Sequence, residues 1–332
     1  IFFDPACGSG NFLLEIFRSH KISVDQLIGI ELNDFSACVA RVSIFLESKK
    51  FPRIIHGNSL RLDWKKIVRG KQIYIVGNPP FLGYSLQTPD QKLDVRRIFD
   101  GWGKLDYAAC WFKLASDFMH GTNFETAFVV TSSICQGESV GILWKKLFEL
   151  GIKINFANRS FKWDLSASVH CSIIGFAMFD RAQKFIDGVE VQNINGYLRN
   201  ASNVCIENRK DPVHEFPSMG MGNQPNDNGN LIIEAEDLDA FVERDPRSKK
   251  FIRRVIGSRE FINNLPRYCL WLKDAEPSDI KSIKPIYERV EAVRKYRLES
   301  KRLATRKRAD FPWLFGDIHQ PDGNFIVVPV VS

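Results

Sequence analysis

Short apolar runs alternate with amphipathic segments through the first half of the chain. Apolar residues that recur at helical spacing predict helices at residues 11–20, 35–49, 106–120 and 140–150. Short apolar runs between these segments predict strands at residues 1–3, 27–30, 53–56, 73–76, 128–131 and 154–157. Strands that alternate with helices in this way are typical of a parallel sheet covered by helices, so we expect an α/β domain.

This alternation changes in the second half of the chain. Residues 169–179 form a long apolar run, which could supply one or both strands of an antiparallel pair that completes the sheet. From about Arg181 the alternation of strand and helix fades, and residues 218–230 are rich in Gly, Asn and Pro. We therefore expect one domain at residues 1–184 and a second domain at residues 185–332.

The longest helical pattern lies at residues 279–308 and is interrupted by Pro285, which we expect near the start of a helix. Residues 281–308 hold eleven Lys or Arg against three Glu, a local excess of eight that exceeds the net charge of +7 of the whole chain. This concentration of charge suits contact with phosphates. A solvated helix face explains the same charges equally well.

Composition places the chain among globular proteins with more than one domain. Its 332 residues, 44% hydrophobic and 26% charged, are more than one domain usually contains. No apolar run approaches the ~20 residues that span a bilayer, and no leader pattern opens the chain, so we expect a cytoplasmic protein without a membrane partner. The seven cysteines form no CxxC pair and do not cluster with His at ligand spacing, so we expect neither a disulfide framework nor a metal site.

Both ends of the sequence look cut. The chain opens without Met on Ile1, directly before a glycine-rich loop, and it closes inside the strand-like run at residues 325–331. We therefore expect a fragment of a longer protein.

The first predicted strand leads into a glycine-rich loop, Asp4-Pro5-Ala6-Cys7-Gly8-Ser9-Gly10, and a helix follows at once. Glycines between a strand and a helix let the backbone approach a ligand closely and direct free N–H groups at it. The dinucleotide fingerprint needs a third glycine where Leu13 stands. The loop therefore favours a smaller, less anionic nucleoside cofactor, although such a loop alone is often only a turn.

The next two strands also end in polar residues. Glu31 lies about twenty residues beyond the glycines, where a carboxylate can accept hydrogen bonds from both hydroxyls of a ribose. Asn58 and Ser59 follow the third strand and could meet the edge of an adenine. Because ligands of open parallel sheets bind at the carboxyl ends of the strands, these side chains predict a nucleoside site, with helix capping as the alternative role of Glu31 and Asn58.

The fourth strand runs into Asn78-Pro79-Pro80-Phe81. Two consecutive prolines remove two N–H donors and leave an acceptor-rich turn. An aryl amine is a poor nucleophile, because its lone pair is delocalised into the ring. If the Asn78 side-chain oxygen and the Pro79 carbonyl each accept one amino hydrogen, the density localises on nitrogen and attack on a sulfonium methyl becomes feasible. Phe81 offers a flat face on which a base turned out of the duplex could stack. The alternative interpretation of the whole Asn78-Pro79-Pro80-Phe81 segment is a rigid surface turn without a catalytic role.

These motifs, in this order, resemble those of amino-group DNA methyltransferases of the gamma order. The resemblance implies a Rossmann-like class I methyltransferase domain with a mixed seven-stranded sheet and S-adenosyl-L-methionine as cofactor. Asp4 is then expected near the methionine moiety, Glu31 on the ribose, and Asn58 with Ser59 near the adenine. The remaining expected cofactor-binding residues are Ala6, Gly8, Gly10 and Leu32. The family also has an aromatic residue that helps hold the flipped base; Phe161 fits best, Trp163 is its rival, and core packing explains either.

The second half resembles the target recognition region of MmeI-like restriction-modification enzymes, at residues 257–262 and 267–271. Those enzymes join an endonuclease, a methyltransferase and a recognition domain in one polypeptide. The resemblance therefore implies an α+β target recognition domain, double-stranded DNA as partner, and an endonuclease domain upstream. We assign no chemistry to residues 257–262, because their apolar and aromatic content suggests a packing role. The cations expected to bind DNA are Arg294, Arg297, Lys301 and Arg302.

The function that this resemblance implies is site-specific methylation of adenine N6 in DNA. Two alternatives stay open: an RNA or protein-glutamine methyltransferase, which would need the same acceptors, and a DNA-specificity module without catalysis. Asp279, Glu299 and Lys301 superficially resemble the carboxylate and lysine set of metal-dependent nucleases. We disfavour this interpretation, because the pattern of residues 299–302 is typical of a charged helix surface.

Overall fold

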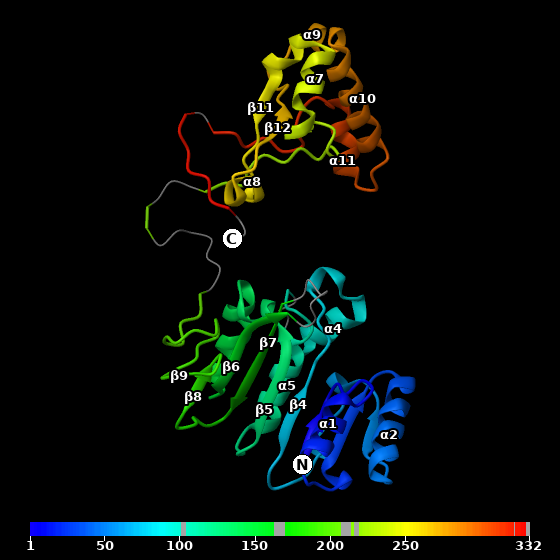
Figure 1. Ribbon diagram of the computed structural model, residues 1–332, viewed down its shortest axis with the longest axis vertical. Coiled ribbons are helices and arrows are strands. Elements are labelled where there is room, and N and C mark those ends of the chain that lie inside the picture. The colour runs from blue at the N-terminus through cyan, green and yellow to red at the C-terminus, as the bar shows by residue number, and fades with distance from the viewer. Residues whose placement is uncertain (101–103, 163–169, 207–213, 216–218, 322, 330–332) are drawn as a thin grey trace. The chain divides into compact units, whose positions relative to one another are not determined.

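The computed structural model describes residues 1–100, 104–162, 170–206, 214–215, 219–321 and 323–329. The chain divides into two compact units, Ile1–Asp211 and Pro212–Ser332 (Figure 1). The predicted boundary after residue 184 lies earlier than this division and falls within a strand of the first unit's sheet.

The first unit is built on one large sheet. Its strands are β1 (Phe2–Asp4), β2 (Leu27–Glu31), β3 (Arg53–His56), β4 (Tyr74–Gly77), β5 (Glu125–Thr131), β6 (Lys153–Lys162), β7 (His170–Ala177), β8 (Lys184–Ile186) and β9 (Val189–Val191). They are arranged in the order β3-β2-β1-β4-β5-β7-β6-β8-β9. The strands from β3 to β5 are parallel, and β7 runs antiparallel to both of its neighbours. The expected α/β class with a mixed sheet is confirmed.

The strand count corrects the prediction, because the described residues form a sheet of nine strands where seven were expected. The additional pair, β8 and β9, is a hairpin that extends the sheet beyond β6. Its turn is Asp187-Gly188, and both residues have positive φ, 51° and 80°. An Asp-Gly dipeptide between apolar residues is a strong hairpin signal, so the sequence does carry the information for these strands.

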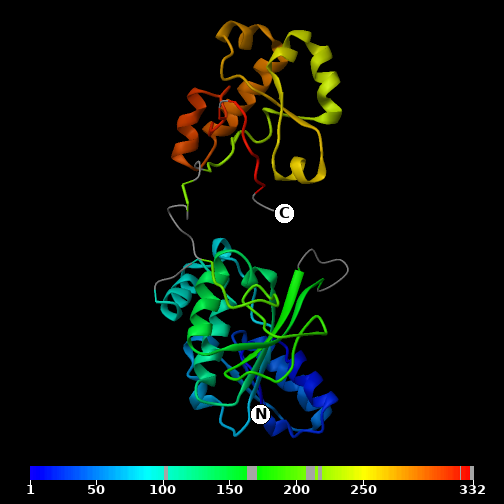
Figure 2. The ribbon, with the colours of Figure 1, turned by 90° about the vertical axis from the view of Figure 1, so that its left-hand side faces the viewer.

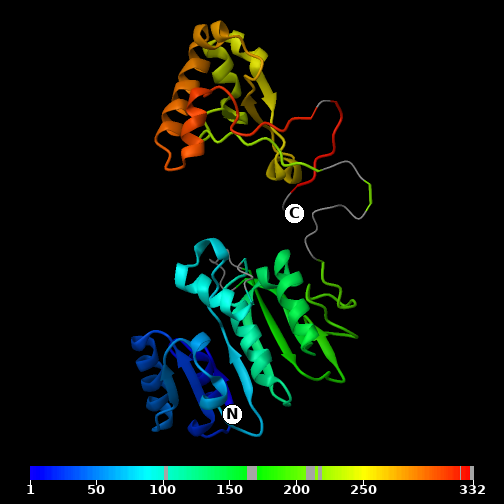
Figure 3. The same cartoon turned by 180° about the vertical axis from the view of Figure 1, so that it is seen from behind.

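Helices cover both faces of this sheet. They are α1 (Asn11–Ser19), α2 (Asp34–Ser48), α3 (Trp64–Ile67), α4 (Pro89–Ile98), α5 (Ala109–Met119) and α6 (Lys145–Glu149). Successive side chains of a strand point to opposite faces of the sheet, so the core has two parts. Phe3 of β1 lies in the buried cluster that includes α5, and Leu27 of β2 lies in the cluster that includes α1 and α2. The predicted helix at residues 140–150 begins as a π-helical turn and continues as α6. Figures 2 and 3 show the same elements from two other sides.

The second unit is the expected α+β domain. Its three-stranded antiparallel sheet has the order β10-β12-β11, with β10 (Ile232–Glu234), β11 (Ile252–Arg254) and β12 (Arg267–Leu270). Its helices are α7 (Leu238–Arg244), α8 (Ser258–Asn263), α9 (Pro277–Ser282), α10 (Lys284–Leu298) and α11 (Leu303–Lys307). The predicted pattern at residues 279–308 thus corresponds to parts of three helices, and Pro285 lies in the first turn of α10 as expected.

The packing expected from the apolar content of residues 257–262 does not come from their large apolar side chains. These residues contribute to α8, where Phe261 and Ile262 are 54% and 48% exposed. The buried member of this helix is Glu260, whose carboxylate pairs with Arg267 and accepts the Gly257 N–H. Apolar content alone did not reveal which side of so short a helix faces the core.

None of the described helices is long and apolar enough to cross a membrane.

Candidate active site

The glycine-rich loop after β1 is held tightly between strand and helix. The Ala6 N–H donates to Asp4 Oδ1 at 3.0 Å, and the Cys7 N–H donates to the carbonyl of Ile30 in β2 at 3.0 Å. Gly10 has a φ of 84°, and a Cβ at this position would lie 2.9 Å from the Cβ of Ala40 in α2. Only glycine therefore allows the chain to turn into α1 this close to α2.

Glu31 at the end of β2 is anchored by backbone groups on two sides. Its Oε2 accepts the Gly8 N–H at 2.9 Å, and its Oε1 accepts the Asn33 N–H at 2.8 Å. Each carboxylate oxygen keeps further acceptor capacity, so this side chain is fixed in direction and still able to receive two hydroxyl donors. The capping alternative does not apply to Glu31, because Asn33 caps α2. Leu32 beside it is 66% exposed.

Asp4 is a buried carboxylic acid at the carboxyl end of β1, with 1% of its surface exposed. Burial raises the pKa of Asp4 to about 7; the Ala6 N–H lowers it, and the nearby negative charge of Glu31 adds to the rise. Its Oδ2 has no hydrogen-bond partner among the described residues. A Cβ at Gly77 would lie 2.6 Å from Asp4 Oδ1, so β4 can pass this carboxyl group only with glycine at that position.

Asn78-Pro79-Pro80-Phe81 follows β4, which lies between β1 and β5 in the sheet. The Asn78 side-chain oxygen Oδ1 is buried and has no hydrogen-bond partner within the described part of the chain. Pro79 is buried, Pro80 is exposed, and Phe81 packs partly against the main core cluster. Buried polar atoms are nearly always hydrogen-bonded to protein, water or a ligand, so this acceptor is available to a donor other than the described residues.

The backbone that follows this turn is clamped by the segment before α5. The Leu82 N–H donates to Asp106 Oδ1 at 3.3 Å, and the Tyr107 N–H donates to the Leu82 carbonyl at 3.0 Å. The buried Gln87 side chain donates to the carbonyls of Leu82 and Leu105 at 2.9 and 2.8 Å. These side chains hold the turn at one position on the rim of the sheet.

The same region also reaches the glycine-rich loop, because the Trp111 indole N–H in α5 donates to the Pro5 carbonyl at 3.1 Å. Sequence reasoning did not identify Gln87, Asp106 or Trp111. Each lies outside any motif, and its role depends on a partner that is near only in the folded chain.

Asn58 follows β3 and caps the short helical turn Ser59–Arg61. Its Oδ1 accepts the Leu60 N–H at 2.9 Å, and its Nδ2 donates to Asp94 Oδ2 in α4 at 3.3 Å. The capping alternative is therefore correct for Asn58, and it leaves one amide hydrogen and one lone pair for a ligand. Ser59 is buried, and its hydroxyl has no partner among the residues described.

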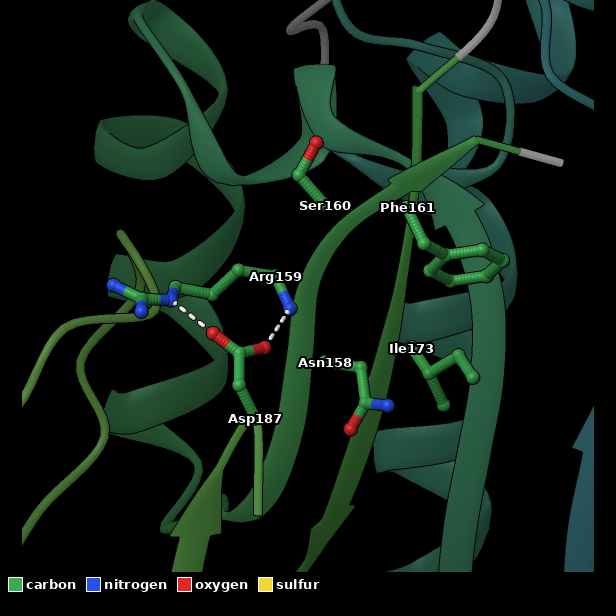
Figure 4. Close-up of a pocket in the computed structure, with 6 residues that line it drawn as sticks. All are labelled: Asn158, Arg159, Ser160, Phe161, Ile173 and Asp187. Atoms are coloured by element: carbon green, nitrogen blue, oxygen red, sulfur yellow. Dashed lines mark hydrogen bonds and ion pairs between the residues drawn. The ribbon is translucent and has the colours of Figure 1, made fainter. Parts of the chain in front are cut away.

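Phe161 lies near the end of β6 and lines a pocket of about 450 Å³ (Figure 4). The pocket is lined by Asn158, Arg159, Ser160, Phe161, Ile173 and Asp187. The Arg159 backbone N–H and Nε each donate to Asp187 at 2.7 Å, and the hydrogen bond from the backbone N–H is the main reason that the pKa of Asp187 lies below its usual value. Phe161 pairs with Cys171 of β7.

Phe161 and the Asn78 turn are separated by three strand positions, since the order is β4-β5-β7-β6. At a strand spacing of ~4.8 Å this is roughly 14 Å between backbones. Because β4 and β6 run in the same direction, Phe81, which follows β4, and Phe161, near the end of β6, lie toward the same edge of the sheet. The rival candidate Trp163 lies outside the described residues.

In the second unit, the four cations expected to bind DNA have different environments. Lys301 and Arg302 are exposed. Arg294 is partly exposed and pairs with Glu291. Arg297 is 1% exposed and donates all five of its N–H groups to backbone carbonyls, so it holds the domain together and cannot contact phosphate, which corrects the prediction.

Two family models match the chain. The model described as "MmeI, DNA-methyltransferase domain" matches residues 1–52 and 45–187, and the model described as "MmeI, target recognition domain" matches residues 200–332.

Individual relatives give the same result. DNA methyltransferase A of Bacillus subtilis (strain 168) is 34% identical over 389 aligned positions, which cover 100% of this chain and 44% of that protein. A methylase subunit of Methanocaldococcus jannaschii, of the type I restriction enzyme MjaVII, is 36% identical over 29% of this chain and 18% of its own length. The solved structure of the type IIL restriction-modification enzyme MmeI in complex with DNA superposes with a TM-score of 0.82 and 37% identity, over 97% of this chain and 51% of that chain. This chain therefore spans about half the length of DNA methyltransferase A and of the MmeI enzyme.

Proposed function

The chain belongs to the MmeI DNA-methyltransferase family, and from that premise we propose that it transfers the methyl group of S-adenosyl-L-methionine to the N6 amino group of an adenine in double-stranded DNA. The observation that carries the proposal is the buried Asn78 Oδ1 without a hydrogen-bond donor among the described residues. A buried acceptor left unpaired costs about 1–3 kcal/mol, and a bound amine removes that cost.

The role of the turn is to hold the amine that receives the methyl group. Asn78 Oδ1 and the Pro79 carbonyl each accept one amino hydrogen, which localises the lone pair on nitrogen. Pro79 and Pro80 have no N–H, so no neighbouring backbone donor competes for these acceptors. The target adenine leaves the base stack to reach them, and Phe81 supplies a ring face for it, with Phe161 as the second candidate. Because Asn78 Oδ1 is enclosed, entry of the base requires rotation of this side chain or a shift of the turn.

The residues at the ends of β1, β2 and β3 suit S-adenosyl-L-methionine. When bound, this cofactor supplies an electrophilic methyl group on a sulfonium. Glu31 accepts the ribose hydroxyls, because both of its oxygens are oriented by backbone N–H groups and keep free lone pairs. Asp4, whose Oδ2 has no hydrogen-bond partner among the described residues, would face the positively charged methionine part, and Asn58 would face the adenine. The remaining residues proposed to line the cofactor are Ala6, Gly8, Gly10, Leu32 and Ser59.

The second unit is proposed to bind the DNA duplex. Its match to a target recognition model and the exposed cations Lys301 and Arg302 support this role. An endonuclease domain on the same polypeptide and a cytoplasmic location stay predictions, and the sequence of the intact gene tests the first of them.

The substrate is tested by incubating the chain with tritiated S-adenosyl-L-methionine and, separately, duplex DNA, RNA and protein acceptors. We expect label in duplex DNA, recovered as N6-methyladenine after digestion to nucleosides. Label found only in RNA or in glutamine of a protein would refute DNA as the substrate, and cofactor binding without transfer to any acceptor would favour a specificity module.

The role of the turn is tested with Asn78→Ala. We expect loss of transfer by at least about 100-fold, the magnitude typical of removing one preorganised hydrogen-bonding partner of a transition state, with cofactor affinity unchanged. Asn123→Ala is the matched control, since this exposed asparagine lies before β5 and its side chain is not part of the site. Equal turnover in both variants would remove Asn78 from the mechanism.

A further inference from the structure

Asp94 is a buried carboxylate that no motif of the sequence contains. It lies in α4 with 3% of its surface exposed. Its oxygens accept hydrogen bonds from Asn58 Nδ2 at 3.3 Å, from Tyr107 OH at 3.2 Å, and from two nitrogens of Arg61 at 3.0 and 3.2 Å. This one side chain therefore joins the segment after β3 to the helix that follows the Asn78 turn.

Two arginine side chains lie beside the Asp94 carboxylate. Arg61 contacts both carboxylate oxygens, and Arg97 of the same helix places its guanidinium 3.7 Å from Oδ1. The main cause of the raised pKa of Arg61 is its hydrogen bond to Asp94. The Asp94 oxygens thus face donors from Asn58, Arg61 and Tyr107, and toward these neighbours they serve as acceptors.

An acceptor at this position determines the orientation of the Asn58 amide. Asn58 must direct its NH2 group at Asp94, because the reversed amide would set two oxygens against each other. The side-chain oxygen is then turned to the opposite side, where it accepts the Leu60 N–H and keeps one lone pair. The group that Asn58 offers to a ligand is thus set from two sides, by the Leu60 N–H that holds its oxygen and by Asp94 that holds its NH2 group.

We propose that Asp94 is a positioning residue for the cofactor, which orients Asn58 so that its oxygen, and not its NH2 group, meets the amino group of the cofactor adenine. This inference rests on the proposed function. An adenine amino group is a hydrogen-bond donor, so it pairs with an oxygen and is repelled by a second NH2 group. Asp94 therefore selects for a nucleoside with an amino group at this position.

The proposal is tested by exchanging the two side chains. Asn58→Asp sets two carboxylates against each other, and we expect S-adenosyl-L-methionine to bind more than tenfold more weakly. Asp94→Asn weakens the contact that holds the Asn58 NH2 group and leaves the Leu60 N–H as the main group that orients the amide, so we expect binding weakened several-fold. The double variant Asn58→Asp/Asp94→Asn again pairs one NH2 group with one carboxylate and again presents an oxygen, so we expect affinity within about threefold of the parent chain.

Isothermal titration with S-adenosyl-L-methionine measures these affinities, and thermal unfolding shows that each variant is folded. Asp90→Asn is the matched control, because Asp90 is exposed on the same helix and is expected to leave affinity unchanged. The Michaelis constant for the cofactor should rise in Asp94→Asn while the rate at saturation is kept, which separates positioning from a general loss of structure.

Either of two results would overturn the inference while leaving the proposed function in place. A double variant that binds no better than Asn58→Asp, although folded, contradicts the proposed orientation. Unaltered affinity in a folded Asp94→Asn variant does the same. A parent chain that binds no S-adenosyl-L-methionine refutes the proposed function itself, and the positioning role with it, so the two failures are distinguishable.

Discussion

Arg297 offers a prediction about stability that does not depend on the function. Its guanidinium donates to the carbonyls of five residues at 2.8–3.1 Å: Pro225, Asn226, Arg308, Phe311 and Leu314. Burial lowers the pKa of Arg297 from its ordinary value. This side chain of α10 therefore ties a segment before β10 to the segment after α11.

The perturbation is Arg297→Lys, which keeps the charge and the helix propensity. A lysine ammonium has three N–H donors on one nitrogen, whereas Arg297 supplies five in a planar fork. At least two of the five carbonyls then lose their donor, at about 1–3 kcal/mol for each buried acceptor. We expect the second unit to lose roughly 3 kcal/mol of stability, which corresponds to a fall of roughly 10 °C in its unfolding temperature.

Hydrogen exchange of peptides from α10, read by mass spectrometry, reports the stability of this unit within the whole chain. Arg294→Lys is the control, because the Arg294 guanidinium is partly exposed and hydrogen-bonds Glu291 and the Ala309 carbonyl, both through contacts that a lysine can partly replace. We expect it to cost less than about 1 kcal/mol. Equal protection of α10 in the two variants would refute the anchoring role.

Three further results are expected. The pKa of Asp4 is raised to about 7 in the folded chain. The protonated carboxyl group therefore contributes folding stability below the unfolded pKa near 4, and this contribution is lost as pH rises through 7. Binding of the cationic cofactor, in contrast, favours the ionised carboxylate. Cofactor affinity should therefore rise about tenfold from pH 6 to pH 8, and Asp4→Asn should flatten this profile; a profile that stays steep would contradict the assignment. Gly77→Ala should weaken cofactor binding more than tenfold, because its Cβ would lie 2.6 Å from Asp4 Oδ1, while Gly83→Ala, where a Cβ meets nothing within 4 Å, is the control. Lys301→Ala and Arg302→Ala should each reduce the salt dependence of duplex binding by about one unit of slope, and an unchanged slope would identify a solvated helix surface.

Much of the first unit followed from local sequence patterns. The strands and helices around residues 4–10, 31 and 58 were predicted to within a few residues, because apolar periodicity and glycine turns act over short distances. The register of parallel strands then brings their polar ends to one edge of the sheet. The helix α4 was not predicted, and its mean hydropathy is low because much of its surface is polar; Asp94 was missed with it.

The sequence by itself determined the order of the motifs, the acceptor-rich chemistry of the Asn78 turn and the α/β class. Only the tertiary structure decided which side chains meet: Asp94 with Asn58 across 36 positions, Trp111 with Pro5 across 106, and Arg297 with Pro225 across 72. A count of charges along the chain cannot distinguish a buried guanidinium from an exposed one, which is why Arg297 was assigned to DNA. The physical reason is that burial and hydrogen bonding depend on packing between distant segments, whereas periodicity and turn chemistry are properties of neighbouring residues.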